Sequence, residues 1–330
     1  MIEIKDFVGK GIDGLSFEAD GKGVFCILCA DEAQRHELSC VMCGCSDANG
    51  GTVTLDGEVM SRRSLSLKKK VRLVPSQLVA DEYCNSVEYL DFVGQTLDIE
   101  SEKRYRQIKE ALELVGMDGA QSKLLGACSS SELCRLSIAA ALIGNPDVIV
   151  LDDPFSIIGD DARKDMYGII NMLSGIKTIV LITGSVEDAR SLCESVAIVS
   201  GGKIAIEGRI DDIETKINAT HEVYITVRGD AERVTNAIKA VDCVVDVRIN
   251  STEANGVHYI RVEHYPDDGM KDKLFEALSA INAPMLSVKE VRLTLEDVYY
   301  SLTPRVDETA TNAEAVEDVR KNRSWRRKNK

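Results

Sequence analysis

Short, continuously apolar runs recur along this chain, and segments with helical spacing separate them. The apolar runs are GVFCIL (23–28), VIVL (148–151) and TIVLIT (178–183). The segments with helical spacing are 86–97, 102–117 and 131–144. Strands that are apolar throughout are typical of parallel sheets, which helices cover on both faces. The alternation therefore predicts an α/β fold around a mostly parallel sheet.

The pattern changes after about residue 218. Strand-like and helical segments then follow one another in the order β-α-β-β-α-β, ending with the strand-like MLSVKEVRLT (285–294). This order is the split-βαβ pattern of ferredoxin-like domains. We therefore expect a main domain at 1–217, a small α+β accessory domain at 218–303 and a disordered basic tail at 304–330.

Composition and charge exclude several classes of protein. The 330 residues carry a net charge of −14, which argues against nucleic-acid binding by the main body. The longest apolar runs are far too short to cross a bilayer, and MIEIKDF at the N-terminus has no signal-peptide character. We therefore expect a cytoplasmic protein.

The C-terminal end has the opposite charge. RKNRSWRRKNK (320–330) holds seven basic residues and the only tryptophan of the chain. Such a segment suits an anionic membrane face or the surface of a permease, which would place the protein at the inner face of the membrane. A disordered tail that only improves solubility is the alternative.

Several phrases of the sequence carry a family resemblance. They are GTVTLDGE (51–58), VEYLDFVG (87–94), AALIGNPDVIVLDDP (140–154), SLCESVAIVSGGKIAIEG (191–208) and LEDVYYSLT (295–303). In order and spacing, the chain up to about residue 217 resembles the ATP-binding subunit of an ABC transporter. The resemblance is to subunits that work with ABC-2 permeases, including gliding-motility-type exporters. It implies a P-loop NTPase-like nucleotide-binding domain.

The phosphate-binding loop that this resemblance implies is altered at every position. The family pattern GxxxxGK[ST] uses glycines, a lysine and a hydroxyl to hold phosphate and Mg²⁺. Counted from the strand, Cys29, Glu32 and Gln34 stand at the glycine positions, Arg35 at the lysine and His36 at the hydroxyl. Glu32 adds negative charge where the triphosphate would lie. We expect a strand–loop–helix that binds nothing, with a weak anion site served by Arg35 as the alternative.

The other nucleotide motifs are altered in the same way. The adenine-stacking aromatic is missing from the link between the first strands, where Phe7 is the nearest aromatic, and Gln77 stands one residue beyond the usual glutamine. The signature LSGGQ appears as CSSSE (128–132), which keeps Ser129 alone. Gly184 stands where the family has its switch histidine.

The strand VIVLDD (148–153) keeps the family's Walker B character. By resemblance, Asp152 is the carboxylate on the Mg²⁺ side, and Asp153 stands where a catalytic glutamate orients water. Aspartate is one methylene shorter than glutamate, so it would hold that water out of line for its attack and slow hydrolysis. A solvated carboxylate pair at a strand end is the alternative, and we favour it because the phosphate loop is lost.

Ten cysteines need a separate account. Cys26, Cys29, Cys40 and Cys43 form a CxxC-x10-CxxC pattern, with Cys45 just beyond, and such spacing can indicate zinc. A strand facing a helix keeps the sulfurs too far apart for tetrahedral ligation. We therefore expect no metal and regard these thiols as buried hydrophobic groups, with a metal site on those four cysteines as the alternative.

Together these patterns predict an ABC-type subunit that has lost catalytic competence. We expect it to be a structural or regulatory partner of an ABC-2 permease, of an active paralogous ATPase in a heterodimer, or of both. ATP and Mg²⁺ are implied by resemblance only, so we expect no bound cofactor. Two alternatives stay open: a weak ATPase that uses Arg35, Asp152 and Asp153, and a metal-binding or redox-sensing protein that uses the cysteine cluster.

Overall fold

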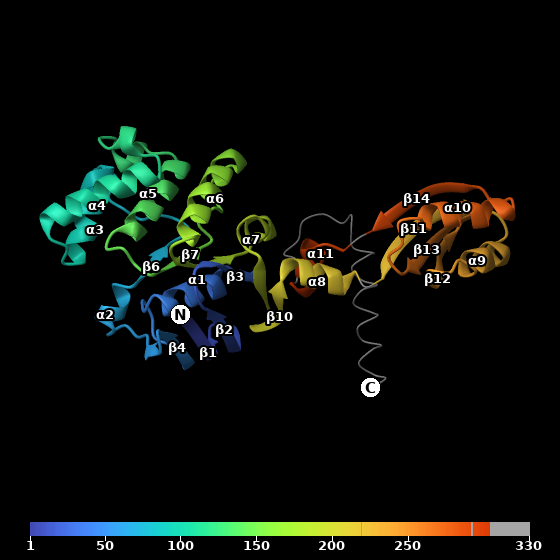
Figure 1. The fold of residues 1–330 in the computed structure, drawn as a ribbon, viewed down its shortest axis with the longest axis horizontal. Coiled ribbons are helices and arrows are strands. Elements are labelled where there is room, and N and C mark those ends of the chain that lie inside the picture. Colours follow the sequence, from blue (N-terminus) through green and yellow to red (C-terminus); the bar gives the residue numbers. More distant parts are fainter. Residues whose placement is uncertain (219, 292, 304–330) are drawn as a thin grey trace. The chain divides into compact units, whose positions relative to one another are not determined.

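The computed structural model describes residues 1–218, 220–291 and 293–303 (Figure 1). The described residues form two compact units: Met1–Ile210 together with residues 299–303, and Asp211–Val298. The sequence-based boundary after residue 217 stays a prediction. The predicted basic tail at 304–330 lies outside the described residues.

A six-stranded sheet forms the centre of the first unit. In sheet order its strands are β10 (Lys203–Arg209), β9 (Ser195–Ser200), β3 (Gly23–Cys29), β8 (Thr178–Thr183), β7 (Val148–Asp152) and β6 (Val71–Val74). All neighbouring pairs are parallel except β9 and β10, which form a hairpin. The three apolar runs coincide with β3, β7 and β8. The prediction of a mostly parallel sheet is therefore confirmed.

Helices lie on both faces of this sheet. The helices of the first unit are α1 (Glu32–Met42), α2 (Leu65–Lys68), α3 (Ser86–Thr96), α4 (Ser101–Leu114), α5 (Ser130–Leu142), α6 (Asp160–Ser174) and α7 (Val186–Leu192), with 3-10 turns at Asp118–Ala120 and Leu125–Ala127. Helix α8 (Ile210–Ile217) belongs to the second unit from Asp211 onward. Helix α1 contacts β3, β7 and β8 from one side, and α6 and α7 contact β3 as well. The helices expected at 86–97, 102–117 and 131–144 are α3, α4 and α5.

A smaller antiparallel sheet covers the outer side of α1. Its order is β2 (Ile12–Ala19), β1 (Ile2–Gly9), β4 (Gly50–Leu55) and β5 (Glu58–Val59). One hydrophobic cluster joins this sheet, α1 and the main sheet, with Phe7, Leu38 and Ile182 all fully buried. Phe7 therefore belongs to the core and offers no face for stacking on a base. Helix α1 is held between two sheets.

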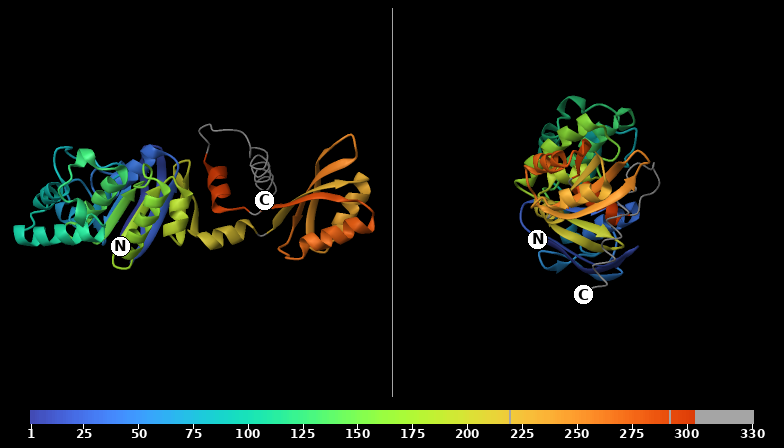
Figure 2. Two further views of the ribbon diagram at one scale, coloured as in Figure 1. Left: turned by 90° about the horizontal axis from the view of Figure 1, so that it is seen from above. Right: turned by 90° about the vertical axis from the view of Figure 1, so that its right-hand side faces the viewer.

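The second unit has the predicted split-βαβ order. Its elements are β11 (His221–Arg228), α9 (Ala231–Lys239), β12 (Val244–Thr252), β13 (Val257–His264), α10 (Met270–Ala280) and β14 (Met285–Val291). The strands form an antiparallel sheet in the order β12-β13-β11-β14, and both helices pack on one face of it (Figures 1 and 2). Alternate β11 residues, Val223, Ile225 and Val227, meet α9 and α10 in one core.

The last helix that the structure describes, α11 (Leu295–Leu302), covers all but the final residue of the LEDVYYSLT phrase and returns the chain to the first unit at Tyr299. Among the residues that the structure describes, no helix combines the length and the apolar content that crossing a bilayer requires.

Candidate functional site

The connection between β3 and α1 is two residues long. Strand β3 ends at Cys29 and α1 begins at Glu32. Asp31 caps the helix: its Oδ1 accepts a hydrogen bond from the Gln34 backbone N–H at 3.0 Å. Glu32 and Gln34, which we interpreted as loop residues at glycine positions, thus lie in the first turn of a helix. With the chain in helical conformation, no open loop is left for backbone N–H groups to surround a phosphate.

Arg35 is turned back into the site that the loop would have formed. Its Nη1 donates to the backbone carbonyl oxygens of Cys29 and Ala30, each at 2.9 Å. Its Nη2 lies 3.1 Å from Oδ2 of Asp153, and the two side chains are only 11% and 14% exposed. The guanidinium is therefore a fixed internal partner of the β3–α1 connection and of Asp153.

Asp153 is held on its other side as well. Thr183, the last residue of β8, donates from Oγ1 to Oδ1 of Asp153 at 2.7 Å. The Asp153 backbone N–H donates to the carbonyl oxygen of Ile182 at 2.8 Å, and its φ of 46° lies in the left-handed region. Both carboxylate oxygens thus have partners within the protein.

Gly184 makes room for Arg35. A Cβ atom added at Gly184 would lie 3.1 Å from Nη1 of Arg35 and 3.6 Å from the carbonyl oxygen of Cys29. A histidine there would press against the guanidinium. A side chain at position 184 and the present place of the Arg35 guanidinium are therefore hard to combine.

Asp152 lies deeper and has partners of its own. The residue is 4% exposed, and its Oδ2 accepts a hydrogen bond from Oγ of Ser39 at 2.9 Å. Nδ1 of His36 lies 3.1 Å from the same oxygen. Because a carboxylate only accepts, this contact assigns a proton to Nδ1, and in the neutral imidazole Nε2 is then the acceptor. Nε2 lies 3.5 Å from Sγ of Cys40.

The signature segment forms a closed helix cap. Ser129 is the N-cap of α5, and its Oγ and the Glu132 side chain form a reciprocal capping box. Lys123 donates to both Glu132 carboxylate oxygens at 2.8 and 2.7 Å, and this partner and Ser129 lower the pKa of Glu132 to about 2. A carboxylate of the chain itself thus occupies the positive end of α5. The structure does not bring Ser129 together with Arg35 or Asp152.

The four cysteines of the alternative metal set are not brought together. Cys26 faces α7, where a hydrogen bond with Cys193 and burial raise its pKa. Cys29 faces α1, with its Sγ 3.4 Å from Oε1 of Gln34. Cys43 is buried in the core cluster, away from Cys26. Within residues 1–218, 220–291 and 293–303, no three side chains of metal-ligating type converge.

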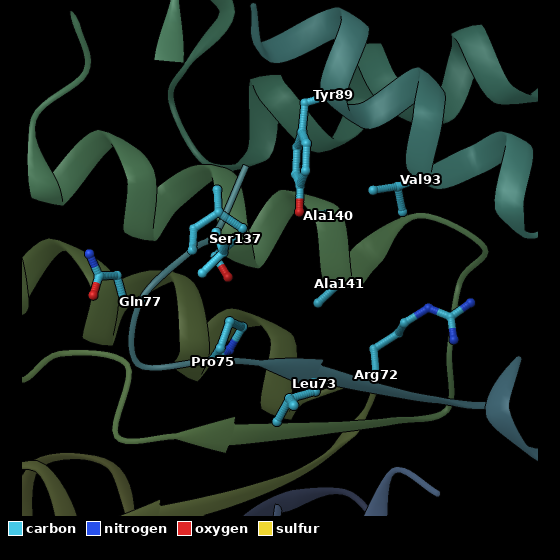
Figure 3. A pocket seen from close by; sticks show the side chains of 11 residues that line it. Arg72, Leu73, Pro75, Gln77, Tyr89, Val93, Ser137, Ala140 and Ala141 are labelled. Atoms are coloured by element: carbon cyan, nitrogen blue, oxygen red, sulfur yellow. The ribbon is translucent and has the colours of Figure 1, made fainter. Parts of the chain in front are cut away.

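A hollow of about 320 Å³ opens between β6, α3 and α5 (Figure 3). Tyr89 of α3 and Ser137 of α5 point into it, and Gln77 lies at its rim. From the sequence, Gln77 was identified only because it stands one residue beyond the position where the family usually has a glutamine. The hollow depends on residues from three distant segments, so no local pattern could have indicated it.

Three residues of the site were missed in the sequence. Ser39 donates a hydrogen bond to Asp152, and Thr183 donates one to Asp153. The third residue is Tyr299 of α11, whose pKa is raised by burial and by the nearby Cys29 thiol. The sequence did offer a signal for Thr183, because this residue ends an apolar strand and directly precedes the altered switch position. The signal for Ser39 was its spacing: it lies one helical turn after Arg35, and therefore on the same face of α1.

Comparison with known proteins gives concordant results. The family model described as "ABC transporter" matches residues 38–156, which begin just after the altered loop. The linearmycin resistance ATP-binding protein LnrL of Bacillus subtilis is 23% identical over 305 residues, covering 92% of this chain and 97% of that protein. The daunorubicin/doxorubicin resistance ATP-binding protein DrrA of Streptomyces peucetius is 21% identical, covering 94% and 92%.

Solved structures give the same fold. A nucleotide-free ATP-binding cassette from an ABC transporter has a TM-score of 0.58 and 17% identity, covering 66% of this chain and 94% of that one. The dimeric cassette MJ0796 has a TM-score of 0.57 and 16% identity, covering 63% and 98%. The predicted fold class is confirmed.

Proposed function

Because the chain carries an ATP-binding domain of the ABC transporter type, we propose that it is a subunit of an exporter that works without binding nucleotide. Its role is that of a structural or regulatory partner. The observation that carries this proposal is the pair of Arg35 and Asp153, which fills the nucleotide site from within.

Electrostatics and space both oppose ATP at this site. The carbonyl oxygens of Cys29 and Ala30 accept hydrogen bonds from the Arg35 guanidinium. A phosphate at this place would face the negative ends of these carbonyl dipoles, and the positive charge of Arg35 would already be engaged by them. His36 and Ser39 already occupy Oδ2 of Asp152, so Mg²⁺ could bind that oxygen only by displacing them. The weak-ATPase alternative needs the contacts of Arg35 to break, and the two-residue connection supplies no backbone cradle in exchange.

The partner class follows from the relatives and from one surface. A relative in Burkholderia lata is named a Nod factor export ATP-binding protein, and it is 26% identical over 198 residues, covering 60% of this chain and 65% of that protein. On this chain, Val79 and Leu78 line the hollow, and the Val79 side chain is 89% exposed. Exposed apolar side chains around a hollow suit an apolar helix of a partner. An ABC-2 permease at the inner face of the membrane supplies such a helix.

The second partner is a paralogous ATPase in a heterodimer. Such a paralogue would supply an intact phosphate loop, and this chain would face it with the CSSSE segment. Ser129 keeps a hydroxyl there, but Glu132 holds it within the cap. We therefore infer that any composite site is slow and that this chain acts chiefly as a scaffold.

Co-expression with a candidate permease and ATPase tests the proposal. We expect a tagged form of this chain to retain the permease, and Val79→Glu to reduce the retained amount severalfold because a charge enters an apolar contact. Val59→Glu is the matched control, because Val59 is also an exposed valine, at 59%, but on β5. Equal losses in the two variants would contradict docking at the hollow. Micromolar affinity of the purified chain for MgATP would contradict the non-catalytic role.

A further inference from the structure

Helix α1 ends in a motif that places two cysteines side by side. The N–H of Gly44 donates to the carbonyl oxygen of Val41 at 3.1 Å, and the N–H of Cys45 donates to the carbonyl oxygen of Cys40 at 2.8 Å. Gly44 has a φ of 65°. These are the two bonds and the left-handed residue of the Schellman motif, in which the side chains at the positions of Cys40 and Cys45 frequently contact each other.

The surroundings of Gly44 fix this helix end. A Cβ atom at Gly44 would lie 2.9 Å from Sδ of Met60 and 2.9 Å from the backbone oxygen of Ser61. The turn is thus packed closely against a neighbouring segment. Cys40 and Cys45 are held near one another by the fold and do not depend on a chance fluctuation.

Cys40 also has a proton acceptor. Nε2 of His36, one turn earlier on α1, lies 3.5 Å from Sγ of Cys40. The contact of Nδ1 with Asp152 orients the ring and selects the neutral tautomer in which Nε2 is the acceptor. Burial and the nearby Cys45 and Asp152 raise the pKa of the Cys40 thiol, so it stays protonated unless a base takes the proton. The Cys40 thiol, the His36 imidazole and the Asp152 carboxylate thus lie in contact, one after the other.

Exposure separates this pair from the third cysteine of the segment. Cys45 is exposed, Cys40 is partly exposed, and the His36 side chain is 68% exposed. Cys43 is 6% exposed and belongs to the hydrophobic core. The CxxC spacing therefore does not give the reactive pair, because its second cysteine points into the core.

We propose that Cys40 and Cys45 form a reversible dithiol–disulfide pair that responds to peroxide, with His36, oriented by Asp152, as the proton acceptor for Cys40. This site is separate from the role proposed for the chain as an exporter subunit. Its chemistry needs one molecule of hydrogen peroxide and two thiols.

The reaction balances in two steps. His36 Nε2 takes the Cys40 proton, and the thiolate attacks one peroxide oxygen: an S–O bond forms, the O–O bond breaks, and the leaving hydroxide takes the proton back from His36 as water. Cys45 then attacks the Cys40 sulfur: an S–S bond forms, the S–O bond breaks, and the second hydroxide leaves as water with the Cys45 proton. Two thiols are oxidised and one peroxide is reduced to two waters. A small thiol such as dithiothreitol reverses the change.

Mass spectrometry of the full-length protein tests the proposal. Trypsin cuts after Arg35 and Arg62, so one peptide holds Cys40, Cys43 and Cys45. After hydrogen peroxide treatment and alkylation of free thiols in denaturant, we expect this peptide to lose the mass of two hydrogen atoms and to carry one alkyl group, on Cys43. Dithiothreitol before alkylation should restore three alkyl groups.

Variants separate this pair from other thiol chemistry. We expect Cys40→Ser and Cys45→Ser to abolish the internal disulfide, and Cys84→Ser, a partly exposed cysteine elsewhere, to leave it unchanged. His36→Asn should slow its formation severalfold. An internal disulfide that persists in Cys45→Ser, or a wild-type peptide that keeps three alkylated cysteines while other cysteines oxidise, would overturn the pairing. An unchanged rate in His36→Asn would overturn the role of His36.

Discussion

The guanidinium of Arg35 and the carboxylate of Asp153 form an ion pair, Nη2 to Oδ2, at 3.1 Å. The lysine and the catalytic carboxylate of an ABC cassette hold opposite sides of a nucleotide phosphate. Here the residues at the two positions hold each other. Gly184, at the switch position, leaves the space that the guanidinium needs. The altered motifs are therefore complementary parts of one closed arrangement.

This pairing predicts a structural role for Arg35. Arg35→Ala leaves Asp153 with one partner fewer and two carbonyl oxygens without donors, so we expect a loss of about 2 to 3 kcal/mol in the free energy of unfolding. Urea denaturation measures it. Arg209→Ala is the control: Arg209 also pairs with a carboxylate at 3.1 Å, but the side chain is 55% exposed, so it should cost less than about 1 kcal/mol.

The double variant Arg35→Ala with Asp153→Ala tests the coupling. If the two residues stabilise the fold through each other, the double variant loses less than the sum of the single losses. Strict additivity would contradict the ion pair as the source of the effect.

Nucleotide binding gives a second prediction. We expect isothermal titration to detect no binding of MgATP at millimolar concentration, either to the wild-type chain or to Arg35→Ala. The arginine is only part of the obstacle, because the connection from Cys29 to Glu32 is too short to form a cradle. Binding that appears in Arg35→Ala alone would show that the guanidinium blocks an otherwise competent site. Micromolar binding to the wild type would contradict the loss of the site.

The fold could be predicted from the sequence because its elements have strong local patterns. The runs at 148–151 and 178–183 read as buried strands, and the later β-α-β-β-α-β order followed from periodicity and turns. The alteration of each nucleotide motif could also be identified by position.

The filling of the site could not be predicted, because it depends on contacts between distant residues. Nothing near Arg35 in the sequence indicates that it turns toward Asp153, more than a hundred residues later. One local signal was available and was not used. The glycine in CVMCGC indicates a helix end at Gly44, where the Cys45 N–H bonds to the Cys40 carbonyl oxygen, whereas the CxxC spacing suggested only the metal set of Cys26, Cys29, Cys40 and Cys43.

The cap of α5 predicts a pH dependence of stability. The folded-state pKa of Glu132 is lowered from 4.5 to about 2 by Lys123 and Ser129, so its contribution is fully present above pH 4.5 and is lost as the pH falls toward 2. The stability advantage of the wild type over Glu132→Gln should therefore shrink across that window. Urea unfolding of both proteins at several pH values measures it.

Two further variants complete that test. Ser129→Ala should cost about 1 kcal/mol near neutral pH, the usual value of an N-cap. Glu113→Gln is the control, because Glu113 is a half-exposed residue in a surface pair with Lys109 at 3.8 Å. A pH-dependent difference of the same size for Glu113→Gln would contradict the assignment to the cap.

The same cap gives the last prediction, which concerns a heterodimer with an active paralogous ATPase. In such a pair the partner's intact phosphate loop would face Ser129 and the N-terminus of α5. Glu132 now directs its carboxylate onto Ser129 and places negative charge at the helix end that would meet a γ-phosphate. Glu132→Gln removes that charge and restores the glutamine of the signature. We therefore expect it to raise ATP hydrolysis by the co-purified pair severalfold, and Ser129→Ala to lower the residual rate.

The control is Glu113→Gln on α4, which should leave hydrolysis unchanged. A pair that forms but hydrolyses ATP equally in all four proteins would contradict the composite site and leave the structural role. A chain that pairs only with itself, beside a paralogue that also pairs only with itself, would contradict the heterodimer altogether.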